Sequence, residues 1–278
     1  SMLTFGTRRR RWPIMNKTEL LNRAAGGDGE LRILLARVLD KLELAQQRNV
    51  PARTDFLSPA QRAAVEDLLN ACGHPRCLFS GGYEGAERTV CAFLPDWQEE
   101  EDWDEEEPLA AMQCTFPKGA DLSHRDMLGS LMGLGITREK IGDILMGEGQ
   151  AQIITLRDTL PILLSQLSKA GRYPLKCGEI ALSTLTVKPP EVKMIRDTVA
   201  ALRLDAVAAS GFSVGRGKAA SLIQSGKLQL NHRDCLKPDK LVEEGDVLSC
   251  RGLGKCVVKE VLGESRKGRM MLLLERYL

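Results

Sequence analysis

Residues 203–231, RLDAVAASGFSVGRGKAASLIQSGKLQLN, decide the fold of the C-terminal part of the chain. Two groups of apolar residues recur at helical spacing, first Leu204, Val207 and Ala208, then Ala219, Leu222 and Ile223. Gly211 and Gly226 follow these groups where a left-handed helix cap is expected. Leu228 and Leu230 then alternate as in a strand. The stretch therefore predicts two short helices followed by a strand.

Two turn signals extend this pattern toward residue 251. Asn231-His232 follows the predicted strand, and Gly245-Asp246 precedes the apolar pair Val247-Leu248. The predicted order is therefore helix, helix, strand, turn, long loop and strand.

Cationic side chains are distributed along this module. Arg216 and Lys218 stand at the start of the second helix, where free amide groups and the helix dipole favour an anion. The cations that follow lie on predicted loops and strand ends: Lys227, Arg233, Lys237 and Arg251. From Arg196 onward the chain has 15 Lys and Arg against 10 Asp and Glu, whereas its whole net charge is only +2. We expect these side chains to form a basic surface for the phosphates of folded RNA.

The module resembles the S4 RNA-binding domain. The resemblance rests on Arg203-Leu-Asp205, Ser210-Gly-Phe212, Arg216-x-Lys218-Ala219, Leu222-Ile223-x-x-Gly226, Leu228-x-Leu230-Asn231 and Gly245-Asp246. Gly215 departs from it, because the family usually has Ser before the Arg, and the missing hydroxyl removes a helix cap. The resulting prediction of RNA-binding residues is Arg203, Arg216, Lys218, Lys227, Asn231, His232, Arg233, Lys237 and Arg251.

The rest of the chain predicts a helical segment and a mixed α+β region. Amphipathic spacing over residues 31–42 and a Ser58-Pro59 helix start indicate two helices, and Gly73 ends the second. Strands are expected at residues 77–79, 89–94, 109–116, 141–146, 151–155 and 180–187, and helices at residues 124–134 and 159–167. The fold class is therefore α+β and multidomain, with a predicted N-terminal helical region at 1–73, an RRM-like α/β sandwich at 74–188 and an S4-like helix-helix-strand domain at 189–278.

The middle of the chain narrows the resemblance to the bacterial YlmH family. The matching segments are Gly81-Gly-Tyr-Glu84, Glu87-Arg88, Phe93-Leu-Pro-Asp96, His124-Arg-Asp-Met-Leu-Gly129, Leu131-Met132, Leu134-Gly-Ile136 and Lys140-Ile-Gly-Asp143. This resemblance implies an N-terminal helical domain, an RRM-like domain and an S4 domain. It further implies binding to rRNA or tRNA on the large ribosomal subunit, in the rescue of stalled ribosomes (ribosome-associated quality control). The acidic run 99–107 departs from it, being longer than the usual loop of the family.

Composition excludes several other classes. The eight cysteines form no CxxC pair, so we expect free thiols in a reducing cytoplasm and no metal site. No apolar run is long enough for a membrane span, and no cofactor fingerprint is present. We expect a cytoplasmic monomer without a cofactor. The run Arg8 to Arg11 could contact nucleic acid or be a frayed basic terminus.

Catalysis is the principal alternative. His124-Arg-Asp126 resembles part of a kinase catalytic loop, but the accompanying kinase motifs are missing. Arg203-Leu-Asp205 resembles the catalytic triplet of pseudouridine synthases, which place it in a large separate domain, so Asp205 is interpreted as a structural or capping carboxylate. We therefore expect no catalytic residue and a non-catalytic RNA-binding protein; an RNA-modifying enzyme and a protein-interaction adaptor remain open.

Overall fold

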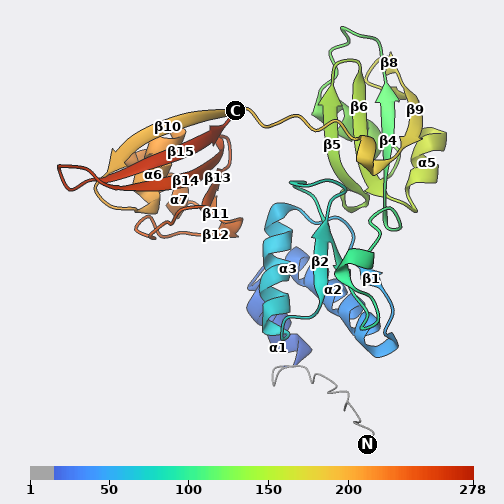
Figure 1. The fold of residues 1–278 in the computed structure, drawn as a ribbon, viewed down its shortest axis with the longest axis horizontal. Helices are drawn as coiled ribbons and strands as arrows, with labels where there is room; N and C mark the ends of the chain where they lie inside the picture. Colours follow the sequence, from blue (N-terminus) through green and yellow to red (C-terminus); the bar gives the residue numbers. More distant parts are fainter. Residues whose placement is uncertain (1–15) are drawn as a thin grey trace, which may run out of the picture. The chain divides into compact units, whose positions relative to one another are not determined.

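The computed structural model describes residues 16–278, and the run Arg8 to Arg11 lies outside them. The chain folds into two compact units, and the boundary between them in the sequence falls after Val187. Both contain helices and antiparallel sheets, so the fold is mixed α and β and multidomain (Figure 1). Each unit is described by itself.

The N-terminal unit begins with three helices. They are α1 (Lys17–Ala25), α2 (Gly29–Arg48) and α3 (Pro59–Ala71). Asn16, Asp28 and Ser58 cap them by accepting hydrogen bonds from first-turn amide groups. The two helices expected in this region are thus confirmed, and Ser58 and Gln61 form a reciprocal capping box.

A small sheet packs on these helices. Its strands are β1 (Ala52–Arg53), β2 (Cys77–Ser80) and β3 (Val90–Phe93), in the order β1-β3-β2. Cys91 and Phe93 of β3 share a buried cluster with Leu35, Leu39 and Leu68 of the helices. The strands predicted at residues 77–79 and 89–94 are present and form a hairpin. Cys91 and Phe93 of this hairpin pack with the preceding helices, whereas the predicted domain boundary at residue 74 placed the hairpin with the region that follows. Strand periodicity does not reveal which partner a strand will pair with.

A four-stranded antiparallel sheet follows the acidic segment. Its strands, in the order β5-β6-β4-β9, are β4 (Leu109–Thr115), β5 (Ile141–Gly147), β6 (Gln150–Leu156) and β9 (Lys176–Ile180). The helices α4 (His124–Gly133) and α5 (Leu160–Gln166) pack on it through Met127, Leu131 and Leu163. A two-stranded ribbon, β7 (Lys169–Ala170) and β8 (Tyr173–Pro174), precedes β9 (Figure 1). Short 3₁₀ turns stand at Glu100–Asp102, Arg138–Lys140 and Leu182–Thr184.

The prediction of a strand at residues 180–187 is wrong. The edge strand ends at Ile180, and Leu182–Thr184 forms a 3₁₀ turn. Residues 176–180 pair with Ala111–Thr115 and so occupy the edge of the sheet. Leu182 turns inward to the cluster that contains Leu109 and Leu156, and this packing, rather than strand pairing, explains the apolar spacing.

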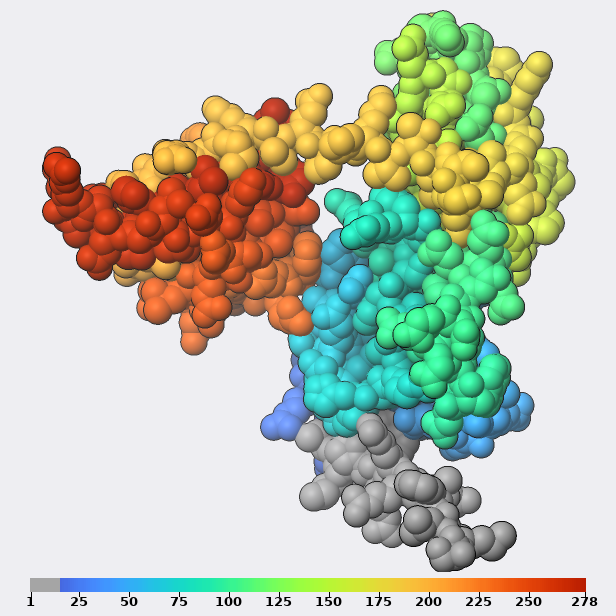
Figure 2. Space-filling view, in the orientation of Figure 1, coloured from blue at the N-terminus to red at the C-terminus, as the bar shows by residue number. Residues whose placement is uncertain are grey.

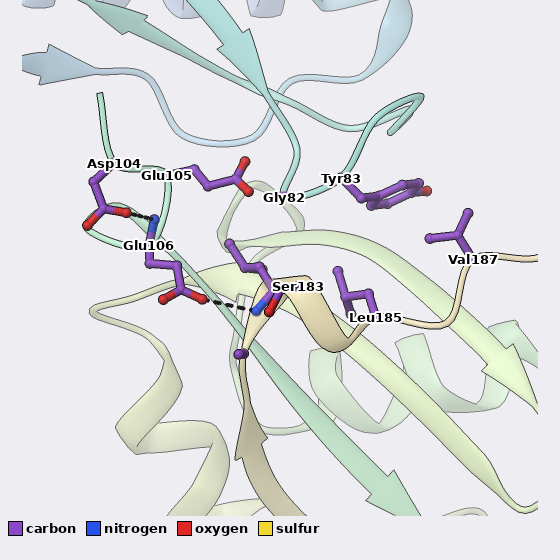
Figure 3. A pocket seen from close by; sticks show the side chains of 10 residues that line it. Gly82, Tyr83, Asp104, Glu105, Glu106, Ser183, Leu185 and Val187 are labelled. Carbon is purple, nitrogen blue, oxygen red and sulfur yellow. Dashed lines mark hydrogen bonds between the residues drawn. The ribbon is translucent and has the colours of Figure 1, made fainter. Parts of the chain in front are cut away.

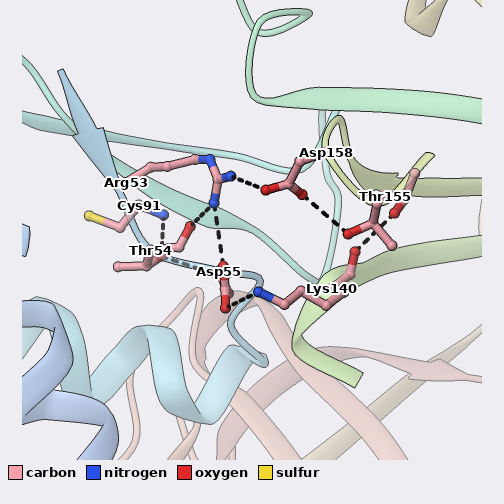
Figure 4. Close-up of polar contacts among 8 residues, drawn as sticks. Arg53, Thr54, Asp55, Cys91, Lys140, Thr155 and Asp158 are labelled. Carbon is pink, nitrogen blue, oxygen red and sulfur yellow. Dashed lines mark hydrogen bonds and ion pairs between the residues drawn. The ribbon is translucent and has the colours of Figure 1, made fainter. Parts of the chain in front are cut away.

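The helical part and the four-stranded sheet form one unit because they share a core and polar contacts. Phe56 and Val90 are buried with Leu109, Ile154 and Leu156. Across the same junction Lys140 Nζ lies 3.1 Å from Asp55 Oδ2, and Arg53 lies 3.8 Å from Asp158 (Figure 4). The apolar contacts carry the junction, because partly exposed ion pairs stabilise by only about 1 kcal/mol or less.

The C-terminal unit is a six-stranded antiparallel sheet with two helices. The strands are β10 (Val192–Val199), β11 (Leu228–Leu230), β12 (Arg233–Asp234), β13 (Val247–Cys250), β14 (Gly254–Glu264) and β15 (Met270–Tyr277). Their order is β10-β15-β14-β13-β11-β12. The helices α6 (Leu204–Phe212) and α7 (Arg216–Gln224) share a buried core with the sheet that includes Val207, Ile223 and Leu274. The turn between β14 and β15 projects from this unit (Figure 2).

The two predicted helices are confirmed, but the expected cap at Gly211 is wrong. The first helix continues to Phe212, and Ser213 adopts the left-handed conformation at φ 54°. Gly211 lies inside the helix, where a Cβ atom would stand 2.5 Å from the Cys256 Sγ. The glycine is therefore explained by close helix–sheet packing rather than by a turn. Gly226, at φ 76°, does follow the second helix.

Candidate nucleic-acid interface

A buried carboxylate organises two of the predicted cations. Asp205 stands in the first turn of α6 and is 5% exposed. Arg203 donates to both of its oxygens, at 3.1 Å to Oδ1 and 3.0 Å to Oδ2. Arg216, at the start of α7, donates to Oδ2 at 3.1 Å. Asp205 thus joins the two helix starts and holds both guanidinium groups, whose side chains remain 41% and 55% exposed.

The ionised state of Asp205 is stabilised by these contacts. Burial by itself would raise its pKa, but the hydrogen bonds from Arg203, Arg216 and the Ala206 amide outweigh burial and lower it. The carboxylate is therefore charged at neutral pH. This geometry agrees with the interpretation of Asp205 as a structural carboxylate.

The start of α7 presents amide groups without a side-chain cap. Gly215 is the N-cap residue, and no side chain caps the helix there. Lys218 is exposed in the first turn of the same helix. The unsatisfied amide groups and the positive end of the helix dipole add to the charge of Arg216 and Lys218, which suits an anion such as a phosphate.

A loop brings further cations to the start of α6. The Leu204 and Asp205 amides donate to the carbonyls of Lys240 and Pro238 at 2.8 and 3.0 Å. This pairing holds the exposed residues Lys237 and Lys240 at the helix start that also carries Arg203. Lys237 was predicted from the sequence and Lys240 was not, since only the loop contact shows that both residues stand at this helix start.

Five cations gather at the two helix starts, and we call them the primary basic surface: Arg203, Arg216, Lys218, Lys237 and Lys240. Lys227 and Arg251 form a second pair past the other end of α7, joined by a hydrogen bond of 2.9 Å from the Arg251 amide to the Lys227 carbonyl. The nine-residue helix α7 spans about 13 Å, so these two groups of cations stand apart.

The other predicted residues lie at the β11–β12 turn. Asn231 and His232 have φ values of 52° and 64°, which form a tight hairpin turn. The Asn231 side chain is used internally, because it donates to Asp246 at 2.9 Å and accepts from the Val247 amide at 2.9 Å. Arg233 donates to the Asn231 carbonyl at 3.2 Å. Asn231 thus fixes the strand connection, while His232 and Arg233 stand at the sheet edge.

A hollow in the N-terminal unit has the wrong charge for RNA. It has a volume of about 590 Å³ and is lined by Tyr83, Leu182 and the carboxylates Asp104, Glu105 and Glu106 (Figure 3). These carboxylates also serve the fold, since Glu106 accepts from the Leu182 amide at 3.1 Å and Glu105 accepts from Ser80 at 3.0 Å. Three carboxylates repel phosphates, so this hollow is not a nucleic-acid site.

The Gly81-Gly-Tyr motif has a structural role beside this hollow. Asp143 of β5 accepts from the Tyr83 hydroxyl at 2.6 Å and from the Glu87 and Arg88 amides at 2.9 and 3.0 Å. Gly82 has φ 91°, and a Cβ atom there would lie 3.1 Å from Leu182. The motif therefore attaches the β2–β3 loop to the four-stranded sheet.

Residues 16–278 were compared with the requirements of a metal site and of a membrane-spanning helix. They contain no group of three or more His, Cys, Asp or Glu side chains placed to hold a metal ion. None of their helices combines the length and hydrophobicity that crossing a bilayer requires.

Comparison with known proteins identifies the family. Residues 30–95 match the family model "YlmH, N-terminal", and residues 103–184 match "Putative RNA-binding domain in YlmH". The chain is 33% identical over 246 residues to the "Ribosome-associated protein quality control protein P2" of Bacillus subtilis, covering 88% of this chain and 95% of that protein. Its structure is similar, at a TM-score of 0.49 and 23% identity, to the "Cell division protein ylmH from Streptococcus pneumoniae", covering 56% of this chain and 94% of that one. The resemblance to the YlmH family read from the sequence is confirmed: the chain belongs to that family.

Proposed function

We propose that this protein is a non-catalytic RNA-binding protein that acts in ribosome-associated quality control in the bacterial cytoplasm. Two findings support the proposal: the family model over residues 103–184 is described as an RNA-binding domain, and the Bacillus relative is named for ribosome-associated quality control. The matched segment is the four-stranded sheet with its helices, which lies within the region 74–188 proposed to be RRM-like.

The C-terminal unit is proposed to be the S4-like module that contacts structured RNA. The observation that carries this assignment is the Arg203–Asp205–Arg216 cluster, in which one buried carboxylate fixes two exposed guanidinium groups. Guanidinium groups held in place before binding lose less conformational entropy when they contact phosphates. The proposed ligand is folded rRNA or tRNA on the large ribosomal subunit, bound by a monomer.

A non-catalytic role is supported by how the chemically capable groups are used. Asp205 is neutralised by two arginines, and Asp143 accepts three hydrogen bonds that hold a loop. The carboxylates Glu105 and Glu106 bond to nearby groups of the fold. A general acid or base needs free access to substrate, which the buried Asp205 lacks.

Charge reversal of the primary basic surface tests the proposal. Arg216→Glu with Lys218→Glu is expected to weaken binding of the full-length protein to a folded tRNA by about tenfold or more, measured by filter binding. Lys218→Glu with Lys237→Glu should weaken binding similarly while leaving the Asp205 ion pairs intact. Wild-type affinity should fall as salt rises, and each lost phosphate contact should reduce the log–log slope by roughly 0.9.

The matched control is Arg266→Glu with Lys267→Glu. Both residues are exposed in the turn between β14 and β15, and the change in charge is the same. This variant should bind folded RNA like the wild type. If the two helix-start variants also bind like the wild type and remain folded by circular dichroism, the C-terminal module is not the RNA contact. If the wild-type protein binds no folded RNA, an adaptor role would replace the proposal.

A further inference from the structure

Charge is separated between the two ends of the four-stranded sheet. β4 begins at Leu109, directly after the acidic segment 99–107, and ends at Thr115. Four cations, Lys118, Lys169, Arg172 and Lys176, belong to segments that meet where β4 ends. A polyanion is repelled at one end of this sheet and attracted at the other.

Long-range pairing gathers these cations. Thr115, the last residue of β4, pairs with Lys176, the first residue of β9, and its hydroxyl donates to the Lys176 carbonyl at 3.4 Å. On the other side of β4, the Phe116 amide donates to the Gly149 carbonyl at 3.0 Å, and the Lys118 Cγ lies 3.2 Å from a Cβ built on Gly149. Lys118 and Lys176 thus flank the end of the same strand.

The β7–β8 ribbon adds two further cations and an aromatic ring. Lys169 pairs with Pro174, and the Leu175 amide donates to the Ser168 carbonyl at 2.8 Å, so the ribbon leads directly into β9 (Figure 1). Tyr173 is partly exposed on this ribbon. The Arg172 guanidinium lies 5.2 Å from the centre of the Tyr173 ring and donates to its hydroxyl at 3.1 Å. Arg172 thereby restricts the orientation of the ring.

These cations are not neutralised by the fold. Lys140 and Arg157 of the same region form ion pairs with Asp55 and Glu179. Within the described part of the chain, Lys118, Lys169 and Lys176 form none. The nearby acids are Asp121, which acts on Arg172 and Tyr173, and Glu148 in the β5–β6 turn. The four cations outnumber them, so the surface remains positive.

We propose that this surface, formed by Lys118, Lys169, Arg172, Tyr173 and Lys176, binds an unpaired RNA segment, with the Tyr173 ring stacking on one base. The cations contact the phosphates on either side of that base. We name it the strand-end surface. The proposal rests on the RNA-binding function proposed above and gives the N-terminal unit a ligand distinct from that of the C-terminal module.

The chemistry favours a single strand over a duplex. Bases in an A-form helix are stacked and paired, so a protruding tyrosine has no base to contact there, whereas an unpaired base exposes its flat face. Stacking of a base on an aromatic side chain is tolerant of sequence, and neighbouring cations follow the backbone. One partly exposed ring beside four cations fits one stacked base with its flanking phosphates.

The test compares two RNA probes on the full-length protein. One is a hairpin with a short single-stranded uridine tail, and the other is the same hairpin without the tail. Wild-type protein should bind the tailed hairpin more tightly. Lys169→Glu with Lys176→Glu should reduce affinity for the tailed hairpin about tenfold and leave the blunt hairpin unaffected. Tyr173→Ala should reduce affinity for the tailed hairpin about fivefold or more. Tyr173→Phe, which keeps the ring, should bind this hairpin with close to wild-type affinity.

The controls separate this proposal from the function on which it rests. Lys41→Glu with Arg48→Glu makes the same charge change on exposed residues of α2 and should leave both affinities unchanged. Equal binding of both hairpins by wild type and by the Tyr173 and lysine variants would overturn the strand-end surface while leaving the C-terminal module intact. Failure of wild-type protein to bind either hairpin would instead overturn the RNA-binding function itself.

Discussion

At the scale of single residues, Asp205 has the largest influence on the C-terminal module. It is almost fully buried, yet it remains ionised because two arginines and a backbone amide donate to it. A buried charge that loses its partners is costly. Without the carboxylate, the two partly exposed guanidinium groups would lose the acceptor that positions them. The position of both guanidinium groups therefore depends on one carboxylate.

Asp205→Asn should lower the free energy of unfolding of the C-terminal unit at neutral pH by about 1–3 kcal/mol. The low pKa of Asp205 means that its stabilisation is complete above its ordinary unfolded pKa, about 4, and is lost as the pH falls toward the lower folded value. Urea unfolding at several pH values measures both effects, and the variant should lose stability less steeply in acid. Asp239→Asn, on an exposed neighbour, is the control; an equal loss in both variants would contradict the role of Asp205.

At the scale of elements, close packing of α6 on the sheet explains an apparent helix breaker. Gly211 occupies the helix interior, where glycine ordinarily costs about 1 kcal/mol relative to alanine. The residue is accommodated because Cys256 of β14 is fully buried directly against it. The short distance between helix and sheet therefore decides the residue at this position, and helix propensity does not.

Gly211→Ala should destabilise the C-terminal unit by about 1–3 kcal/mol, because the added methyl group overlaps the Cys256 sulfur. Cys256→Ala in the same chain should recover part of this loss, which a double-mutant cycle followed by thermal unfolding measures. Gly217→Ala in α7 has open space around its Cβ and should stabilise slightly. Additive effects of the Gly211 and Cys256 substitutions would exclude the contact.

At the scale of the whole molecule, the two units have separate cores. Phe56 is buried with residues of the four-stranded sheet and joins both parts of the N-terminal unit. Val258 and Leu274 belong to the core of the C-terminal unit. Each unit should therefore respond to its own core substitutions.

Phe56→Ala should lower the stability of the N-terminal unit by about 3–5 kcal/mol and leave amide protection in residues 188–278 unchanged. Val258→Ala should lower the stability of the C-terminal unit and leave amide protection in the N-terminal unit unchanged. Hydrogen exchange resolved by mass spectrometry reports both units in one sample. Loss of protection in both units after either substitution would show that they unfold together.

The sequence alone determined the local elements and the family. The cap at Ser58 marked a helix start because capping depends on residues three positions apart. The paired helices α6 and α7 were equally evident from apolar spacing. Arg216 and Lys218 could be named as candidates because helix starts attract anions wherever they occur.

Only the tertiary structure decided which segments meet. It assigned the 77–93 hairpin to the helical core, ended the edge strand at Ile180, and joined Arg203 to Arg216 through Asp205. It also brought Lys240 to the start of α6, and Lys118 and Lys176 to the end of β4. Neighbouring residues determine the hydrogen bonds within a helix or turn. Strand partners and buried ion pairs depend instead on packing between residues far apart in the chain.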